Sequence, residues 1–550
     1  MPEDSSSAAS LNEEKPASVR TTGLVALAVM CSRVLGLIRE MIFNSMFDRY
    51  FRDCFLAAFR IPNLLRDLFA EGALSTAFVT VFSQKIKTGG DASAWALAHR
   101  MLTLTMIFMS IVTVLGMILA RPVVWMLCGS WPEHKLNFTV TLTQWMFPFI
   151  LMVSLAALVM GMLNSKKIYG APAMASSFFN IVSIAGGMGL AYLLHYLTSG
   201  NLDHKDFGAW AMTGFSIGTL LGGLAQLAVQ IPALRRAGYR FMFDRDWRDA
   251  GVQRILTLMW PSVLAGSAVQ VNVMVNTIFA TNLALNDGPV SWLNSAFRLM
   301  QLPLGVFGVT VATVTLPILS RVATDGITPK FREILGNGNR LVLFLTLPCA
   351  AGLFFLAHPI ISVIFERGNF TAFESEQTAG ALRWYAIGLI FYSVIKVIQP
   401  AFTAIGHQRF PMYVALASIS VNMLLNSIFV FYLRLDHTWL AFTTAIVACG
   451  NCTALYIVLG RITGGLESRK LMESLRRLVI PLLAITVVSW AAWHQFMQPR
   501  WADAGIIGRC FALGCAIIAA GTAYIGLAHV FKAEEATQFL SLAGRKLKKR

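Results

Sequence analysis

Long apolar stretches, separated by short polar segments, run through almost the entire chain. A helix needs ~20 mainly apolar residues to cross a bilayer, and fourteen such stretches can be placed in the sequence. Their approximate limits are 22–47, 54–83, 101–120, 139–163, 172–197, 208–231, 252–284, 290–320, 338–358, 378–404, 411–433, 438–460, 477–496 and 506–531. The pattern predicts an all-α polytopic membrane protein with about fourteen transmembrane helices and no soluble domain.

Charged residues interrupt the first two stretches, between positions 32 and 84. An ionised side chain inside hydrocarbon costs at least ~2.5–3.5 kcal/mol unless it faces a partner or a water-filled cavity. At ~100° per residue, four residues of the second stretch fall within ~40° of one another. They are Asp53, Arg60, Asp67 and Glu71. In the first stretch Arg33 and Glu40 share a face, so we expect the two helices to line a polar pathway.

An internal repeat relates the two halves of the chain. Ala58-Phe59-Arg60 recurs as Ala296-Phe297-Arg298 at an offset of 238 residues, and the segment 164–172 resembles 405–411. Because the repeat shifts by six stretches, both halves have the same topology. We predict two pseudo-symmetric six-helix lobes around a central cavity, with Arg298 as the counterpart of Arg60. The lobes are expected at 21–236 and 250–461, followed by two helices within 472–531.

Composition and charge agree with a membrane protein. The chain is 56% hydrophobic and 13% charged, with a formal net charge of +17. The basic residues gather in alternate connections, as cytoplasmic loops do, which argues against nucleic acid as a partner. The opposite connections contain few, such as Lys135, Lys205 and Arg434. This pattern predicts that both termini are cytoplasmic, in a disordered tail over 1–20 and a basic tail over 532–550.

Few residues indicate catalysis or a cofactor. Cys449 and Cys452 form a C-x-x-C inside an apolar helix without a second ligand pair, which favours small packing residues over a metal site. No glycine-rich phosphate loop with a lysine is present. The acids of the expected outer loops show no paired pattern; they are Glu133, Asp203, Asp206, Asp287, Glu366 and Glu374. We predict a protein that is not an enzyme and has no cofactor.

The excess intramembrane charge is positive, because Arg298, Arg383 and Lys396 add to the first-half arginines. Arginine forms forked hydrogen bonds with phosphate oxygens, which favours an anionic passenger. The alternative is that these charges form internal salt bridges that hold helices together.

Asparagine side chains recur in two other apolar stretches. With a nearby threonine they form a set expected to make interhelical hydrogen bonds, or alternatively to supply neutral oxygens to a Na⁺. The set is Asn272, Asn276, Asn422, Asn426 and Thr443.

Several motifs resemble one family, the MurJ (MviN) lipid II flippases of the MOP exporter superfamily. The longest are S-R-V-L-G-x-x-R-[DE] at 32–40 and D-x-F-x-x-A-F-[KR]-[IL]-P-N-L-L-R at 53–66. Shorter matches are F-A-E-G-A at 69–73, S-W at 291–292, R-L-M at 298–300, F-x-x-G-x-F-T at 365–371 and Y-x-x-G-L-I at 385–390. The similarity extends over essentially all fourteen stretches. The chain departs from the family pattern at Asp67, where a basic residue is usual, and at Gln301, where some relatives have Glu.

The resemblance implies a lipid II flippase of the bacterial inner membrane that serves cell-wall synthesis. It would move undecaprenyl-diphosphate-linked precursor to the periplasmic leaflet by alternating access, as a monomer among membrane lipids. Na⁺ or the membrane potential would be the driving force. The family positions expected to matter are Arg33, Arg39, Asp53, Arg66, Glu71, Ser291 and Arg298.

Two alternatives remain open. The first is another transporter of the same superfamily, either an oligosaccharide-lipid flippase or a drug/cation antiporter. An antiporter for cationic drugs would be expected to have a net acidic cavity, whereas this one is net basic. The second is a scaffold protein with the same fold and no transport, in which the charged stripe would tolerate neutral substitution.

Overall fold

The computed structural model describes residues 19–68, 74–283, 287–324, 326–501 and 503–537. All regular elements within these ranges are helices. The first half contains α1 (Val19–Met46), α2 (Arg49–Leu65), α3 (Ser75–Ile118), α4 (Ala120–Cys128), α5 (Glu133–Met146), α6 (Pro148–Ser165), α7 (Gly170–Ser199), α8 (Ala209–Ala228) and α9 (Ile231–Arg236). The predicted all-α fold is confirmed.

The second half continues with another set of long helices. They are α10 (Ala250–Thr281), α11 (Pro289–Pro303), α12 (Val309–Ala323), α13 (Pro329–Phe355), α14 (Ala357–Phe365), α15 (Ala372–Ala404), α16 (Arg409–Ser427), α17 (Thr438–Thr463), α18 (Ser468–Ala491) and α19 (Ile506–Val530). A π-helical turn, η3 (Leu304–Gly308), joins α11 to α12.

Eleven helices in the described part are long and apolar enough to cross a membrane. Some are longer than the predicted stretches because helices continue through turns: α3 contains Gly90 at φ 70°, a left-handed conformation that glycine adopts without strain. Three predicted stretches lie largely outside those eleven: 22–47 corresponds to α1, 252–284 to α10, and 54–83 covers most of α2 and the start of α3. The total of fourteen stays a prediction.

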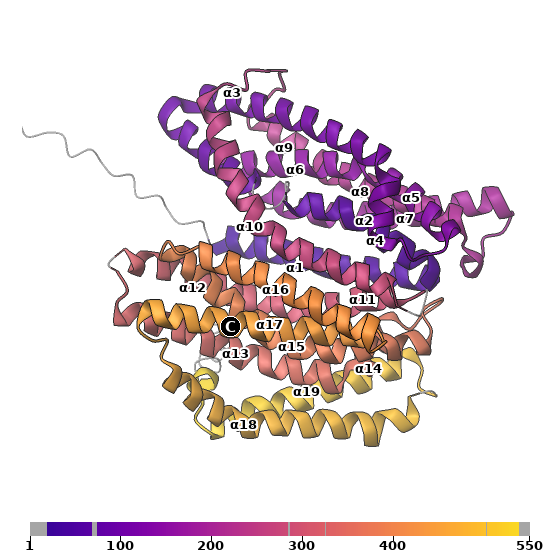
Figure 1. The fold of residues 1–550 in the computed structure, drawn as a ribbon, viewed down its shortest axis with the longest axis vertical. Helices are drawn as coiled ribbons and strands as arrows, with labels where there is room; N and C mark the ends of the chain where they lie inside the picture. Colours follow the sequence, from indigo (N-terminus) through magenta and orange to yellow (C-terminus); the bar gives the residue numbers. More distant parts are fainter. Residues whose placement is uncertain (1–18, 69–73, 284–286, 325, 502, 538–550) are drawn as a thin grey trace, which may run out of the picture.

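The helices form two main groups (Figure 1). Helices α2 to α9 lie together on one side, α11 to α17 lie on the other, and α1 and α10 run between them. The last two helices, α18 and α19, lie along the outer side of the second group. This arrangement places α2 and α11, the two helices that contain Arg60 and Arg298, on facing sides of the middle of the molecule.

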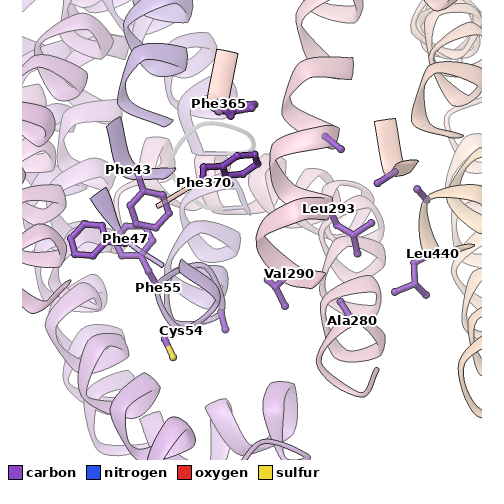
Figure 2. Packing of buried hydrophobic residues seen from close by; sticks show 14 of the residues in the cluster. Phe43, Phe47, Cys54, Phe55, Ala280, Val290, Leu293, Phe365, Phe370 and Leu440 are labelled. Atoms are coloured by element: carbon purple, nitrogen blue, oxygen red, sulfur yellow. The ribbon is translucent and has the colours of Figure 1, made fainter. Parts of the chain in front are cut away.

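The largest hydrophobic cluster crosses between the two groups. Phe43, Phe47 and Phe55 from α1 and α2 belong to the same buried cluster as Leu293 and Phe370 (Figure 2). The two halves are therefore packed together at the end where α1 ends and α11 begins.

Candidate functional site

A cavity between the two halves contains several of the predicted residues. It encloses about 650 Å³ of empty space, including solvent at its mouth. It is lined by Arg39, Glu40, Phe43, Phe55, Leu56, Phe59, Arg60, Asn63, Phe215, Thr219, Asn294 and Arg298. A second pocket shares Arg60 and Asn294 and continues towards α10, α15 and α17. Arg39, Arg60 and Arg298 thus border one central space.

The three arginines have different surroundings. Arg298 Nη1 lies 2.7 Å from Glu40 Oε2, and Asn294 donates to Glu40 Oε1 at 3.0 Å. Arg39 lies over the ring of Phe179, 4.9 Å from its centroid. Arg60 has no ion pair with any residue of the described part, and its buried Nε lacks a hydrogen-bond partner there. The cavity therefore combines three cations with one carboxylate, and of the three only Arg298 is ion-paired within the described part.

The acidic partner of Arg298 comes from the other half of the molecule. Arg298 has no acidic partner in its own stretch, but α1 of the other half supplies Glu40. The interpretation as an internal salt bridge therefore holds for this arginine and does not extend to Arg60.

Asp53 lies outside the cavity, contrary to our expectation that it lines it. Its side chain is 1% exposed, and its two oxygens accept from the backbone N–H groups of Gly288 (2.7 Å) and Ser291 (2.8 Å). These groups lie at the N-terminus of α11, where free N–H groups and the helix dipole favour a carboxylate. Asp53 joins the two halves at that end. Ser291 is its partner and also does not line the cavity; its hydroxyl donates to Gly288 O at 2.9 Å.

Asp67, the departure from the family pattern, also makes contact across the halves. It accepts from Arg66 at 2.7 Å and from Gln270 of α10 at 2.9 Å. Arg66, one of the predicted family positions, therefore pairs with its own neighbour. Gln301, the second departure, is exposed.

Arg33 packs against the other half as well. A Cβ added to Gly305 of η3 would lie 2.0 Å from Arg33 Nη1, so the guanidinium lies directly against the backbone of η3 and would have to move if residue 305 had a side chain. Glu71, the last residue of the predicted stripe, lies outside the described residues. The functional roles of Arg33 and Glu71 stay predictions.

The end of the molecule where α1 ends and α11 begins, at which the two halves are packed together, is called the closed end below. Two ion pairs at this end were not predicted from the sequence. Arg52 pairs with Glu374, with 0% and 3% of their side chains exposed, and Arg52 lies 4.9 Å from the ring centroid of Phe370. Lys135 Nζ lies 2.7 Å from Asp287 Oδ1. Both acids were expected to be unpaired loop residues. No pattern in the sequence indicates these partners, because each pair joins residues far apart in the chain.

Lys135 was expected in an outer loop, and that prediction is wrong. It belongs to α5 and is 1% exposed, with its ammonium 3.7 Å from the ring centroid of Trp131. A cation stacked on an aromatic face and paired with a carboxylate tolerates burial.

The asparagine set forms a hydrogen-bonded cluster between α10, α16 and α17. Asn422 donates to Asn272 and to Asn276, the latter at 2.9 Å, and Asn426 donates to Asn276 at 2.9 Å. Thr443 donates to Asn426 at 2.5 Å. These bonds fit the interhelical role, while Oδ1 of Asn422 has no partner in the described part. A Na⁺ at this position remains an untested prediction.

Other predicted charges lie away from the cavity. Arg383 pairs with Glu376 at 3.4 Å, and neither it nor Lys396 borders the two central pockets. Cys449 and Cys452 are free thiols. No group of three or more His, Cys, Asp or Glu side chains in the described ranges is arranged to hold a metal.

The family model described as "Lipid II flippase MurJ" matches residues 42–507. The chain belongs to the MurJ family of lipid II flippases.

Individual relatives of this family match most of the chain. The "Probable lipid II flippase MurJ" of Bdellovibrio bacteriovorus is 30% identical over 533 residues, covering 96% of this chain and 97% of the relative. The "Lipid II flippase MurJ" of Burkholderia cenocepacia is 34% identical over 436 residues, covering 78% and 81%. The predicted family is confirmed.

Solved structures support the fold. "Lipid II flippase MurJ, inward closed conformation" superposes with a TM-score of 0.74 at 22% identity, covering 93% of this chain and 99% of that one. An inward-facing multidrug resistance MATE transporter of the MOP superfamily gives 0.57 at 16% identity, covering 81% and 94%. The chain therefore has the fold shared by the MurJ family and its MOP superfamily neighbours.

Proposed function

We propose that this protein moves lipid II, the undecaprenyl-diphosphate-linked peptidoglycan precursor, from the cytoplasmic to the periplasmic leaflet of the inner membrane. Family membership supports the substrate class. The observation that carries the proposal is the central cavity, where three arginines from both halves face one carboxylate. The protein works as a transporter rather than an enzyme, with both termini cytoplasmic.

Arg60 is the residue best suited to bind the diphosphate. It is partly buried, its Nε has no partner, and no carboxylate of the described part neutralises it. A guanidinium in such a site offers forked donors to phosphate oxygens. Burying an unpaired charge disfavours folding, so its presence indicates a role other than stability.

Arg39 and Arg298 complete the anion site from either side. Arg39 contacts an aromatic face rather than an acid, and Arg298 shares its charge with Glu40. A diphosphate that enters would compete with Glu40 for Arg298. The charged headgroup would cross inside the cavity, avoiding the large cost of desolvating it in lipid, while the polyprenyl tail stays in the bilayer.

Movement by alternating access requires the closed end to separate. Opening would break three links between the halves: Asp53 with the start of α11, Arg52 with Glu374, and Lys135 with Asp287. Because the cavity carries a net positive charge, an inside-negative membrane potential would favour the conformation in which the cavity faces the cytoplasm, by ~2.3 kcal/mol per charge per 100 mV. Na⁺ coupling through the asparagine cluster is the alternative driving force.

Complementation of a strain depleted of its lipid II flippase tests this function. We expect the wild-type chain to restore growth and Arg60→Ala to fail, although Arg60→Ala should fold at least as stably because it removes a partly buried charge that has no counter-charge. Arg383→Ala is the matched control, since Arg383 is a half-exposed arginine outside the cavity. Failure of the folded wild-type protein to rescue would refute the function. Full rescue by Arg60→Ala would refute the assigned site.

A drug/cation antiporter remains the competing function, because MATE transporters share the fold. The same strains separate the two functions: an antiporter would confer resistance to cationic drugs and would not restore growth. The net positive charge of the cavity argues against cationic cargo.

A further inference from the structure

A separate pocket lies on the first half of the molecule, away from the central cavity. It is formed by α3, α6, α8, α9 and the segment that follows α9. Its empty space is about 1390 Å³, including its open mouth, against about 650 Å³ for the central cavity. It is lined by Leu102, Met106, Leu155, Val159, Leu227, Ile231, Leu234, Arg235, Tyr239, Arg240 and Phe241. It shares no residue with either central pocket.

The lining combines an apolar interior with two cations. The residues from α3, α6 and α8 are all aliphatic or Met, whereas Arg235 and Arg240 are exposed. Neither arginine is ion-paired with a residue that the structure describes. This combination is complementary to a molecule with an apolar tail and an anionic head.

The segment after α9 is held in place by specific bonds. The Tyr239 hydroxyl lies 3.2 Å from His99 Nδ1, which also accepts from the Met242 N–H at 3.2 Å. Arg100 Nε donates to Asp244 at 2.9 Å, and the Asp244 N–H donates to Thr103 at 3.2 Å. The conformation of this segment is therefore fixed by hydrogen bonds to α3.

That same segment exposes three consecutive apolar side chains. Phe241, Met242 and Phe243 are 49%, 65% and 54% exposed. Contiguous exposed apolar surface marks a binding or membrane-contact site, and aromatic residues flanked by arginines suit the lipid headgroup region. The mouth of the pocket is thus expected at the level where phospholipid headgroups lie.

We propose that this pocket binds one anionic phospholipid of the surrounding membrane. One acyl chain would occupy the apolar groove, where each buried CH₂ adds ~0.8 kcal/mol, and the phosphate would lie between Arg235 and Arg240. The segment 237–249 is the connection between α9 and α10. A lipid bound there would contact the link between the two halves.

Binding is tested with the full-length purified chain by native mass spectrometry, titrating phosphatidylglycerol and, separately, neutral phosphatidylcholine. We expect one saturable phosphatidylglycerol site, weakened about 30-fold by Arg235→Ala/Arg240→Ala, from ~1 kcal/mol for each basic residue near an anionic lipid surface. The matched control is Arg236→Ala/Arg248→Ala, which removes the same charge from exposed positions outside the pocket. The affinity of this control variant for phosphatidylglycerol should stay within about threefold of that of the wild-type chain.

A second variant tests the groove without changing charge. Met106→Trp places a bulky side chain in the apolar interior and should reduce phosphatidylglycerol binding at least tenfold while both arginines remain. Equal weakening by the two double substitutions would overturn the proposal, since it would indicate diffuse surface attraction. Equal affinity for phosphatidylcholine, or unchanged binding by Met106→Trp, would also overturn it. Because transport is not measured, the outcome is independent of the proposed flippase activity.

Discussion

Glu374→Gln is expected to open the closed end of the molecule. Glu374 and Arg52 come from opposite halves and are almost fully buried together. Glu374 also accepts from the Thr371 N–H at 3.0 Å, as part of the capping box that starts α15. Glutamine fills this capping role as well as glutamate does, so the substitution should leave the helix start intact and remove only the counter-charge of Arg52.

The magnitude follows from the burial of the pair. Removing one partner of a buried ion pair typically costs ~3–5 kcal/mol, because it leaves the other charge uncompensated. Arg52 depends on this partner, since its Nε and Nη1 lack hydrogen-bond partners in the described part. The cost applies only while the end is closed, because opening lets the guanidinium reach water. A loss of ~3 kcal/mol would shift the closed–open equilibrium ~100-fold.

Thiol accessibility measures this shift. Ser295 is 1% exposed and accepts from Asn44 of the other half at 3.2 Å, so Ser295→Cys should react with an impermeant maleimide only when the end opens. We expect Glu374→Gln to raise the reaction rate from the periplasmic side up to ~100-fold. The same variants without Ser295→Cys give the background from the native cysteines.

Two further variants make the result decisive. Glu376→Gln changes an exposed acid on the same helix and should leave the rate unchanged. Arg52→Met/Glu374→Leu replaces the pair by apolar side chains, which is often neutral or stabilising, and should return the rate towards wild type. An unchanged rate in folded Glu374→Gln would refute the reasoning that this pair holds the halves together.

Three other predictions follow from the same contacts. Asp53→Asn should lower the free energy of unfolding by ~1–3 kcal/mol, because only one amide oxygen remains for two buried N–H groups. Asp48→Asn, at the exposed cap of α2, is the control and should be neutral. Thermal unfolding compares the two variants, and equal effects would contradict the role of Asp53 in joining the two halves. Replacing Na⁺ by choline should leave the Tm unchanged if the asparagine cluster is purely structural, and a rise with Na⁺ would show that it binds the ion. The backbone N–H of Asp246 and the Arg100 guanidinium hold the pKa of Asp244 below its usual range, so anchoring of the segment should persist above the ordinary aspartate pKa and weaken as pH falls through the depressed value. Hydrogen-exchange protection factors, which correct for the intrinsic rate at each pH, measure this, and protection that does not fall as the carboxyl is protonated would contradict it.

The sequence by itself determined the helices and one polar face. Asp53, Arg60 and Asp67 recur at intervals of two helical turns, and all three face the other half in the structure. Arg298, which the repeat predicts as the counterpart of Arg60, borders the same cavity. Helical periodicity and internal symmetry are local properties of the chain, which is why one sequence sufficed to find them.

Only the tertiary structure decided what each residue on that face does. The two halves are in contact at some depths and apart at others. Asp53 is hydrogen-bonded to the start of α11, Arg60 borders the cavity, and Asp67 is hydrogen-bonded to Gln270. Arg52 and Glu374 are 322 residues apart. Such a pair depends on how two packed bundles approach each other, a relation that no local pattern of apolar and charged positions contains.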